Sequence, residues 1–161
     1  MEFLSLIILV LLPVIGGLII FGPWFPQNEV KIRRFAKGWA GLVFVYSLLF
    51  VAFFNPALRG YQFENFLKLP GGKSWIEPLG INFAFAVDGI SITLVVLTTF
   101  LVLLSLFASK YSITKRHKLY YSLIFILETA ILGVFTAKDL FLFFLFWEIE
   151  LIPMYFLISI W

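Results

Sequence analysis

Three glutamates fall in the middle of long apolar runs, where a carboxyl group is costly to keep. Glu148 and Glu150 lie in the stretch FFLFWEIELIPMYF, and Glu128 lies in the apolar run from Leu119 to Thr136. On insertion scales an ionised acid at the centre of a bilayer costs about 2.5–3.5 kcal/mol. An acid at this depth usually faces a water-filled cavity or a basic partner. We therefore take Glu148 and Glu150 first, and Glu128 after them, as candidates for proton transfer.

Helix geometry separates the two neighbouring acids. At about 1.5 Å per residue, Glu148 lies about 12 Å and Glu150 about 15 Å beyond Leu140, where their apolar run begins. Glu128 lies about 13 Å beyond Leu119, the start of its own run. Two residues subtend about 200° around a helix, so Glu148 and Glu150 face different sides. We expect one to face a working cavity and the other a neighbouring helix or subunit.

Pro153 is expected to loosen the backbone between the two acids. Proline has no N–H, so the Ile149 carbonyl loses its usual helical donor and the helix can kink. The freed carbonyl could accept a hydrogen bond from water or from another helix. The alternative is a packing kink without function, which membrane helices tolerate.

A carboxyl group that takes up and releases a proton at this depth needs a basic partner that approaches and withdraws. Every lysine and arginine of the sequence lies between the apolar runs or at their ends. We therefore expect the partner to come from another chain or from sequence beyond Trp161. The competing interpretation is that the acids are protonated and only hold helices together by hydrogen bonds.

Composition predicts an all-α integral membrane protein around these acids. Hydrophobic residues make up 62% of the 161 residues and charged residues 13%, whereas about a quarter of the residues of a soluble domain are charged. Each crossing of a bilayer core of about 30 Å needs about 20 apolar residues. We expect a single membrane segment, residues 1–161, with five transmembrane helices at 3–22, 35–54, 89–109, 119–136 and 140–161. A signal peptide is an alternative for the first run, but no basic residue precedes it.

The segments between the runs set the expected orientation. Eight of the 12 lysines and arginines lie in two short connections: Lys31, Arg33, Arg34, Lys37, Lys110, Lys115, Arg116 and Lys118. The positive-inside rule places these connections on the inner side and the N-terminus outside. His117 is expected to be a solvated residue of the second basic loop. Orientation in the membrane explains the net charge of +3, and we expect no nucleic-acid partner.

The long outer segment 55–88 is expected to carry a short strand or hairpin. Turns are predicted at LPGGKSW and EPLG, and the following stretch INFAFAV alternates large apolar residues. Asp88 and Gly89 are predicted to form a turn in which Asp88 caps the third helix. Asp139 is expected to cap the fifth helix in the same way.

The chain contains no cysteine and one histidine. These counts exclude cysteine-ligated zinc, iron–sulfur clusters and covalently attached c-type haem within the chain. Redox chemistry would therefore have to take place in a partner.

Two stretches carry a family resemblance. Residues 133–161, GVFTAKDLFLFFLFWEIELIPMYFLISIW, resemble the fourth and fifth helices of the antiporter-like subunits of respiratory complex I and its photosynthetic relative, of the NuoM/NdhD type. Residues 79–91, LGINFAFAVDGIS, are similar to the outer loop and third-helix start of those subunits. The doubled acid WEIEL looks more like the cyanobacterial and plastid form. The chain looks like the N-terminal third of such a subunit, which has about fourteen helices overall.

The resemblance implies a role for each acid. In the family, the glutamate directly after the tryptophan is the proton-path residue, which implies this role for Glu148. Glu150 matches an acid of the NdhD-like members. The family pairs its fifth-helix glutamate with a lysine on the seventh helix.

The resemblance further implies a membrane subunit that contributes to proton translocation coupled to NAD(P)H or ferredoxin:quinone electron transfer. NAD(P)H or ferredoxin, flavin, iron–sulfur clusters and quinone would bind to partner subunits, and none is expected to bind to this chain. The expected partners are the other membrane subunits of a hetero-oligomer and the lipid bilayer. We expect the bacterial inner membrane or a cyanobacterial thylakoid or plasma membrane, with an organellar membrane as an alternative. The competing functions are a subunit of a multisubunit cation/proton antiporter and a non-transporting scaffold.

Overall fold

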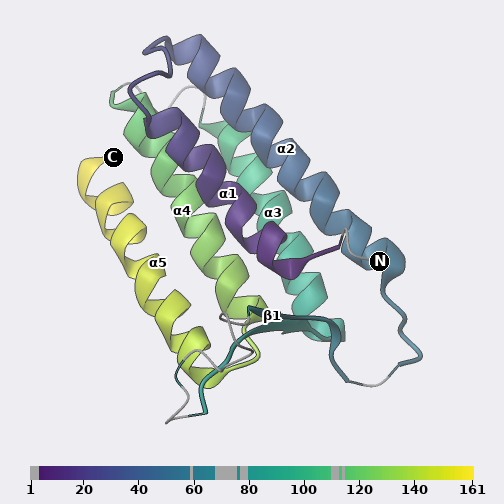
Figure 1. Cartoon of the computed structure of the whole chain (residues 1–161). Coiled ribbons are helices and arrows are strands. Elements are labelled where there is room, and N and C mark those ends of the chain that lie inside the picture. The colour runs from purple at the N-terminus through teal and green to yellow at the C-terminus, as the bar shows by residue number, and fades with distance from the viewer. Residues whose placement is uncertain (1–3, 59, 68–75, 77–79, 110–112, 114) are drawn as a thin grey trace.

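The computed structural model describes residues 4–58, 60–67, 76, 80–109, 113 and 115–161. These residues form five helices and a small two-stranded sheet (Figure 1). The elements in chain order are α1 (Leu6–Phe21), α2 (Glu29–Phe53), β1 (Gln62–Leu67), β2 (Phe83–Val87), α3 (Gly89–Ala108), α4 (His117–Thr136) and α5 (Leu140–Ile160). The predicted order of five helices with a hairpin between the second and the third is confirmed.

Four of the helices, α2 to α5, are long and apolar enough to cross a membrane. The remaining helix, α1, is also apolar but is shorter, with 16 residues, and contains Pro13. It is shorter than the predicted run 3–22, of which residue 3 lies outside the described part of the chain. The chain is a multi-pass membrane protein.

Two helices start earlier than predicted, because polar residues that hydropathy does not mark form their first turns. The predicted second helix begins at Phe35, but α2 begins at Glu29, where the Asn28 side chain accepts a hydrogen bond from the Lys31 N–H at 3.2 Å. The basic stretch expected to be a loop therefore forms the first turns of a helix. Similarly, α4 begins at His117 instead of Leu119.

The predicted end of the third helix, Ser109, is one residue beyond the last residue of α3. The fifth helix begins as predicted and ends one residue early.

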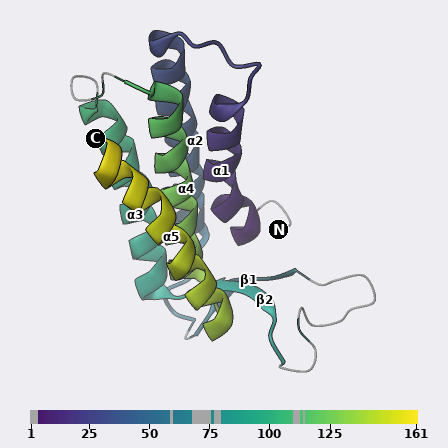
Figure 2. The same cartoon turned by 90° about the vertical axis from the view of Figure 1, so that its left-hand side faces the viewer.

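The sheet lies across one end of the helix bundle (Figure 2). Strand β1 pairs antiparallel with β2, with Gln62 opposite Val87 and Leu67 opposite Phe83. The alternation predicted for β2 does not produce one solvent-exposed face, because all four residues from Ala84 to Val87 are buried. The turns predicted at LPGGKSW and EPLG fall mainly on residues 69–75 and 77–79, which lie outside the described residues.

The predicted cap of α3 is confirmed. The Asp88 carboxylate accepts hydrogen bonds from the N–H groups of Ile90 at 3.0 Å and Ser91 at 2.8 Å, and the Ser91 hydroxyl accepts from the Asp88 N–H at 2.8 Å. The Ser91 N–H is the main cause that lowers the pKa of Asp88. Gly89 is the first residue of the helix.

The turn between α4 and α5 is tied to the sheet. The Lys138 N–H donates to the Ala84 carbonyl at 2.9 Å, and Ala137 forms a bridge with Phe85. Asp139 caps α5, as predicted, by accepting from the Phe141 N–H at 2.9 Å. This three-residue turn fixes where α5 starts relative to α4 and the sheet.

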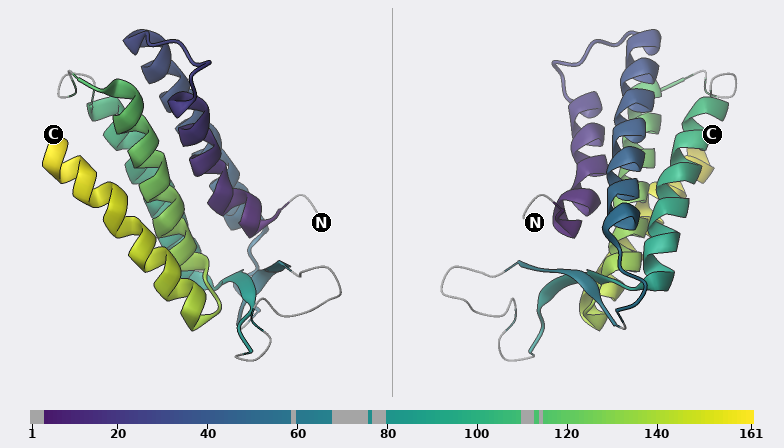
Figure 3. Two further views of the ribbon diagram at one scale, coloured as in Figure 1. Left: turned by 60° about the vertical axis from the view of Figure 1, so that its left-hand side comes forward. Right: turned by 90° about the vertical axis from the view of Figure 1, so that its right-hand side faces the viewer.

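Helix α4 is central and α5 is peripheral. Helix α4 contacts α1, α2, α3 and α5, whereas α5 packs chiefly on α4. In Figure 3, α5 lies at the edge of the bundle, on the other side of α4 from α1 and α2. The two helices that carry the candidate acids therefore have different surroundings.

Candidate functional site

The α4–α5 hairpin brings the three candidate acids to a similar level. Glu128 lies eight residues before Thr136, the last residue of α4, and Glu148 lies eight residues after Leu140, the first residue of α5. Both are therefore about 12 Å from the closed end of the hairpin, and Glu150 is about 15 Å from it.

Glu148 lies on the open face of α5. Its side chain is exposed and borders a shallow apolar hollow that is also lined by Phe141, Phe144, Leu145 and Ile149. Neither this carboxylate nor that of Glu150 has a hydrogen-bond or ion-pair partner among the residues that the structure describes.

Glu150 is half-buried, so the two acids of α5 have different surroundings. This agrees with their angular separation of about 200°.

Pro153 lies inside α5, which continues through it to Ile160. Its side chain is buried. Ile149, whose carbonyl the proline deprives of a donor, lines the same hollow as Glu148.

Glu128 is fully buried, with 0% of its surface exposed. It shares one face of α4 with three other fully buried side chains, Tyr121, Phe125 and Leu132. Both of its carboxylate oxygens are buried without a hydrogen-bond partner in the described part of the chain. Of the three predicted acids, the one ranked last is the one that the chain itself encloses.

Glu128 lies on the side of α4 that faces away from α5. The contact surface toward α5 includes Gly133, where an added Cβ would lie 2.3 Å from the Phe146 ring. Glu128 precedes Gly133 by five residues, which is about 140° around the helix. Glu128 therefore points into the bundle, away from α5, and the structure does not bring it together with Glu148.

A polar contact between α1 and α4 adjoins Glu128. The Thr129 hydroxyl accepts a hydrogen bond from the Val14 N–H at 2.9 Å, and the Ser122 hydroxyl donates to the Gly17 carbonyl at 2.8 Å. The sequence analysis did not identify these residues. Their sequence signal is Pro13 with the glycines that follow it, since a proline and small residues let neighbouring helices approach the backbone.

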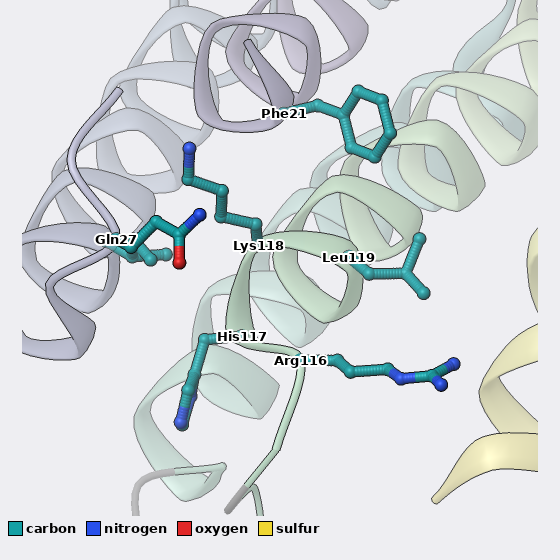
Figure 4. Close-up of a pocket in the computed structure, with 7 residues that line it drawn as sticks. Phe21, Gln27, Arg116, His117, Lys118 and Leu119 are labelled. Carbon is teal, nitrogen blue, oxygen red and sulfur yellow. The ribbon is translucent and has the colours of Figure 1, made fainter. Parts of the chain in front are cut away.

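Most of the described basic residues lie at the end of the bundle opposite the sheet, where α2 and α4 begin. Figure 4 shows Arg116, His117 and Lys118 at the start of α4, beside Gln27 and Phe21. The Lys118 ammonium donates to the carbonyls of Gly22 at 3.0 Å and Phe25 at 2.5 Å, which ties α4 to the connection between α1 and α2.

The prediction of a solvated loop position for His117 is wrong. It is the first residue of α4, its side chain is 16% exposed, and its Nε2 lies 3.6 Å from a carboxylate oxygen of Glu29. Helix α2 begins earlier than predicted and supplies this acid.

Within the described ranges, the lysines and arginines of the helices lie in the stretch from Lys31 to Lys37 of α2 and at Lys118 of α4. No group of three or more His, Asp or Glu side chains in the same ranges could hold a metal ion.

Comparison with known proteins identifies the family. Residues 35–136 match the sequence model described as "NADH-ubiquinone oxidoreductase chain 4, amino terminus". The chain is 40% identical over 163 residues to NAD(P)H-quinone oxidoreductase chain 4 3 of Picosynechococcus sp., with 99% of this chain covered. It is 38% identical over 166 residues to NAD(P)H-quinone oxidoreductase chain 4 1 of Nostoc sp., again with 99% of this chain covered. The chain spans 28% of the length of each of these relatives.

A solved structure shares the fold. A chain in the structure titled "membrane-bound sulfane sulfur reductase (MBS), an archaeal respiratory membrane complex" superposes with a TM-score of 0.70 at 19% identity. The match covers 96% of this chain and 23% of that one. Together with the sequence matches, which cover nearly all of the chain, these findings confirm the predicted relationship: the chain belongs to the family of NADH-ubiquinone oxidoreductase chain 4, whose amino-terminal part it matches.

Proposed function

We propose that this chain forms part of the membrane arm of a proton-translocating NAD(P)H- or ferredoxin:quinone oxidoreductase and that Glu148 is its protonatable channel residue. The observation that carries the proposal is the place of Glu148, exposed at mid-depth on the open face of α5 and bordered by an apolar hollow. The relatives at about 40% identity are named NAD(P)H-quinone oxidoreductase chains, which supports the coupling to quinone reduction.

The open face of α5 requires a partner surface. A carboxylate facing lipid at the bilayer centre has neither water nor a counter-charge to stabilise it. We infer that other helices of the assembly cover this face and bring a basic group to Glu148. Proton uptake then follows the approach and withdrawal of that group, because a nearby positive charge favours the ionised carboxylate.

Glu150 has a different proposed role. It is half-buried and points to a different side of α5 from Glu148. We assign it to a contact with a neighbouring helix or to a second proton path. Pro153 supports Glu148 in this scheme by leaving the Ile149 carbonyl free to bind water beside it.

The electron-transfer chemistry belongs to partner subunits in this proposal. NAD(P)H or ferredoxin, flavin, iron–sulfur clusters and quinone would bind to those subunits, and this chain would move protons only. The relatives named above come from cyanobacteria. We therefore propose a bacterial inner membrane or a cyanobacterial thylakoid or plasma membrane as the location.

The experiment is Glu148→Gln in the assembled complex reconstituted into sealed vesicles. Glutamine keeps the shape of the side chain but cannot ionise, so we expect proton translocation to fall by about 10²-fold or more, as for the loss of a proton-transfer group. The readouts are proton uptake by a pH-sensitive dye and quinone reduction by absorbance. The control is Glu64→Gln, which removes an exposed acid on β1, outside the apolar helices, that pairs with Lys138 at 2.8 Å. Unchanged proton translocation in Glu148→Gln would assign the acid to a scaffold role.

A further inference from the structure

We propose that Glu128 is a second protonatable site of this chain, enclosed by α1 to α4, which holds its proton while those helices are packed together and releases it when they part. This inference rests on the proposed function, because the proton that Glu128 exchanges is one that the complex translocates. It concerns a different side of α4 from the channel residue Glu148.

The burial of Glu128 sets its protonation state in the packed bundle. The side chain is 0% exposed and neither oxygen has a hydrogen-bond partner among the described residues. An ionised carboxylate without donors in an apolar interior carries the full cost of its lost hydration, whereas the neutral acid carries far less. The packed arrangement therefore holds the carboxyl group as the neutral acid.

The surrounding helices supply no counter-charge. Within the described ranges, α1 and α3 contain no titratable side chain, and α2 contains only Tyr46 beyond its basic first turns. On α4 itself, Tyr120 and Tyr121 lie nearer the basic end, and the Tyr121 hydroxyl lies 3.4 Å from that of Ser109. The acids of α5 lie on the far side of α4.

A pair of buried hydroxyls lies at a similar level of the bundle. Ser47 of α2 and Thr99 of α3 are both 0% exposed, and their oxygens are 2.9 Å apart. Thr99 lies ten residues from the sheet end of α3, and Glu128 lies eight residues from the sheet end of α4. Their levels therefore agree to within about one helical turn. These hydroxyls are the polar groups of facing helices through which a proton or a water could reach Glu128.

The hydroxyl pair retains acceptor capacity. Ser47 also contacts the Phe44 carbonyl at 2.7 Å, and Thr99 the Val96 carbonyl at 3.0 Å. Each hydroxyl has one proton to donate and two lone pairs to accept. The pair can therefore accept a hydrogen bond from an entering water.

The proton balance of the step is simple. On loading, a carboxylate oxygen of Glu128 forms an O–H bond with a proton delivered by water, and on release that bond breaks and the proton passes to a water that has entered between the helices. No atom is oxidised or reduced. Release requires the helices to part, because water must replace the missing donors before the carboxylate can ionise.

The test compares three variants in the assembled complex: Glu128→Gln, Glu128→Asp and Glu148→Gln. Glutamine reproduces a neutral acid in shape and hydrogen bonding, so a purely structural Glu128 predicts unchanged proton translocation in Glu128→Gln. The proposal predicts loss of proton translocation per quinone reduced in Glu128→Gln and recovery in Glu128→Asp. If Glu148→Gln abolishes translocation and Glu128→Gln does not, the inference fails and the proposed function stands. If neither variant affects translocation, the proposed function fails as well.

A spectroscopic measurement tests the protonation itself. The carbonyl stretch of a neutral carboxyl group is resolved in infrared difference spectra taken before and after quinone reduction, and it shifts in heavy water. We expect one component of this band to be present in the wild-type complex and in Glu148→Gln but absent from Glu128→Gln. A wild-type spectrum without a neutral carboxyl band, or a band that is unchanged in Glu128→Gln, would overturn the inference. The wild-type measurement holds even if the glutamine variant does not assemble.

Discussion

Helices α4 and α5 are a matched pair with opposite surroundings. They have 20 and 21 residues, and each carries an acid eight residues from the turn that joins them. Yet Glu128 of α4 is fully buried, whereas Glu148 of α5 is exposed. The difference comes from position in the bundle, because α4 touches all four other helices and α5 packs chiefly on α4.

This difference assigns different needs to the two acids. In the inference above, the enclosed acid ionises only when the helices part, because its carboxylate has no hydrogen-bond donor among the described residues. In the proposed function, the open acid depends on a surface that the rest of the assembly provides. Similar hydropathy along two helices therefore does not imply similar chemistry.

The largest expected effect comes from placing a positive charge at each acid in turn. Glu128→Lys puts an unpaired ammonium into the bundle, and we expect it to lower the free energy of unfolding by about 3 kcal/mol. Glu148→Lys lies on an exposed face, so in detergent we expect a loss below about 1 kcal/mol. Tryptophan fluorescence during thermal unfolding measures both. Equal losses would remove the distinction between enclosed and open acids.

The contact between the two helices can be broken at Gly133. Gly133→Ala places a methyl group within 2.3 Å of the Phe146 ring, and overpacking of this kind costs about 1–3 kcal/mol. The matched control is Gly41→Ala, because nothing lies within 4 Å of a Cβ at that position of α2. There we expect a gain of up to about 1 kcal/mol from helix propensity. A stable Gly133→Ala with an unmoved α5 would contradict the close packing.

The enclosure of Glu128 can be weakened at the next residue. Thr129→Val keeps the shape but removes the acceptor of the Val14 N–H. Hydrogen bonds between membrane helices contribute about 0.6 kcal/mol and at most about 1.7 kcal/mol, so we expect a loss in that range. Thr93→Val is the control, because Thr93 is exposed and bonds only within its own helix. Faster hydrogen–deuterium exchange along α1 in Thr129→Val alone would support the contact.

The smallest expected effect concerns Asp88, an acid that accepts hydrogen bonds from two backbone N–H groups, unlike Glu128. Because backbone N–H groups lower the pKa of Asp88, its ionised form stabilises the fold. This contribution is complete above its ordinary pKa of 3.8 and is lost as the pH falls through the lowered value. Asp88→Asn still caps the helix, so we expect a change below about 1 kcal/mol at neutral pH and less acid sensitivity below pH 3.8. Identical acid unfolding of both proteins would contradict this.

Much of the fold follows from sequence patterns that are local. Five apolar runs, the caps Asp88 and Asp139, and the strand before α3 are each specified by a few neighbouring residues. Hydropathy did not predict the starts of α2 and α4, because the Asn28 cap and the basic first turn are polar. Hydropathy did not predict strand β1 either, since Gln62 and Glu64 interrupt its apolar residues.

The candidate site was less predictable than the fold. Counting residues along the runs placed all three acids at mid-depth, but no local pattern tells which side of a helix its neighbours will cover. The packing of α1 to α4, which no local pattern specifies, makes Glu128 the enclosed acid. The hydroxyl contacts that adjoin it join residues more than 100 positions apart in the chain.

The short turn that the sheet holds in place also fixes the angular register of α5. An inserted residue between Thr136 and Leu140 would rotate everything after it by about 100° and shift it by about 1.5 Å along the helix. Glu148 would then leave the side on which its proposed partner docks, while Glu128 would stay where it is. Designers who need to lengthen this protein or fuse a reporter to it should therefore leave the interval between these two acids unchanged.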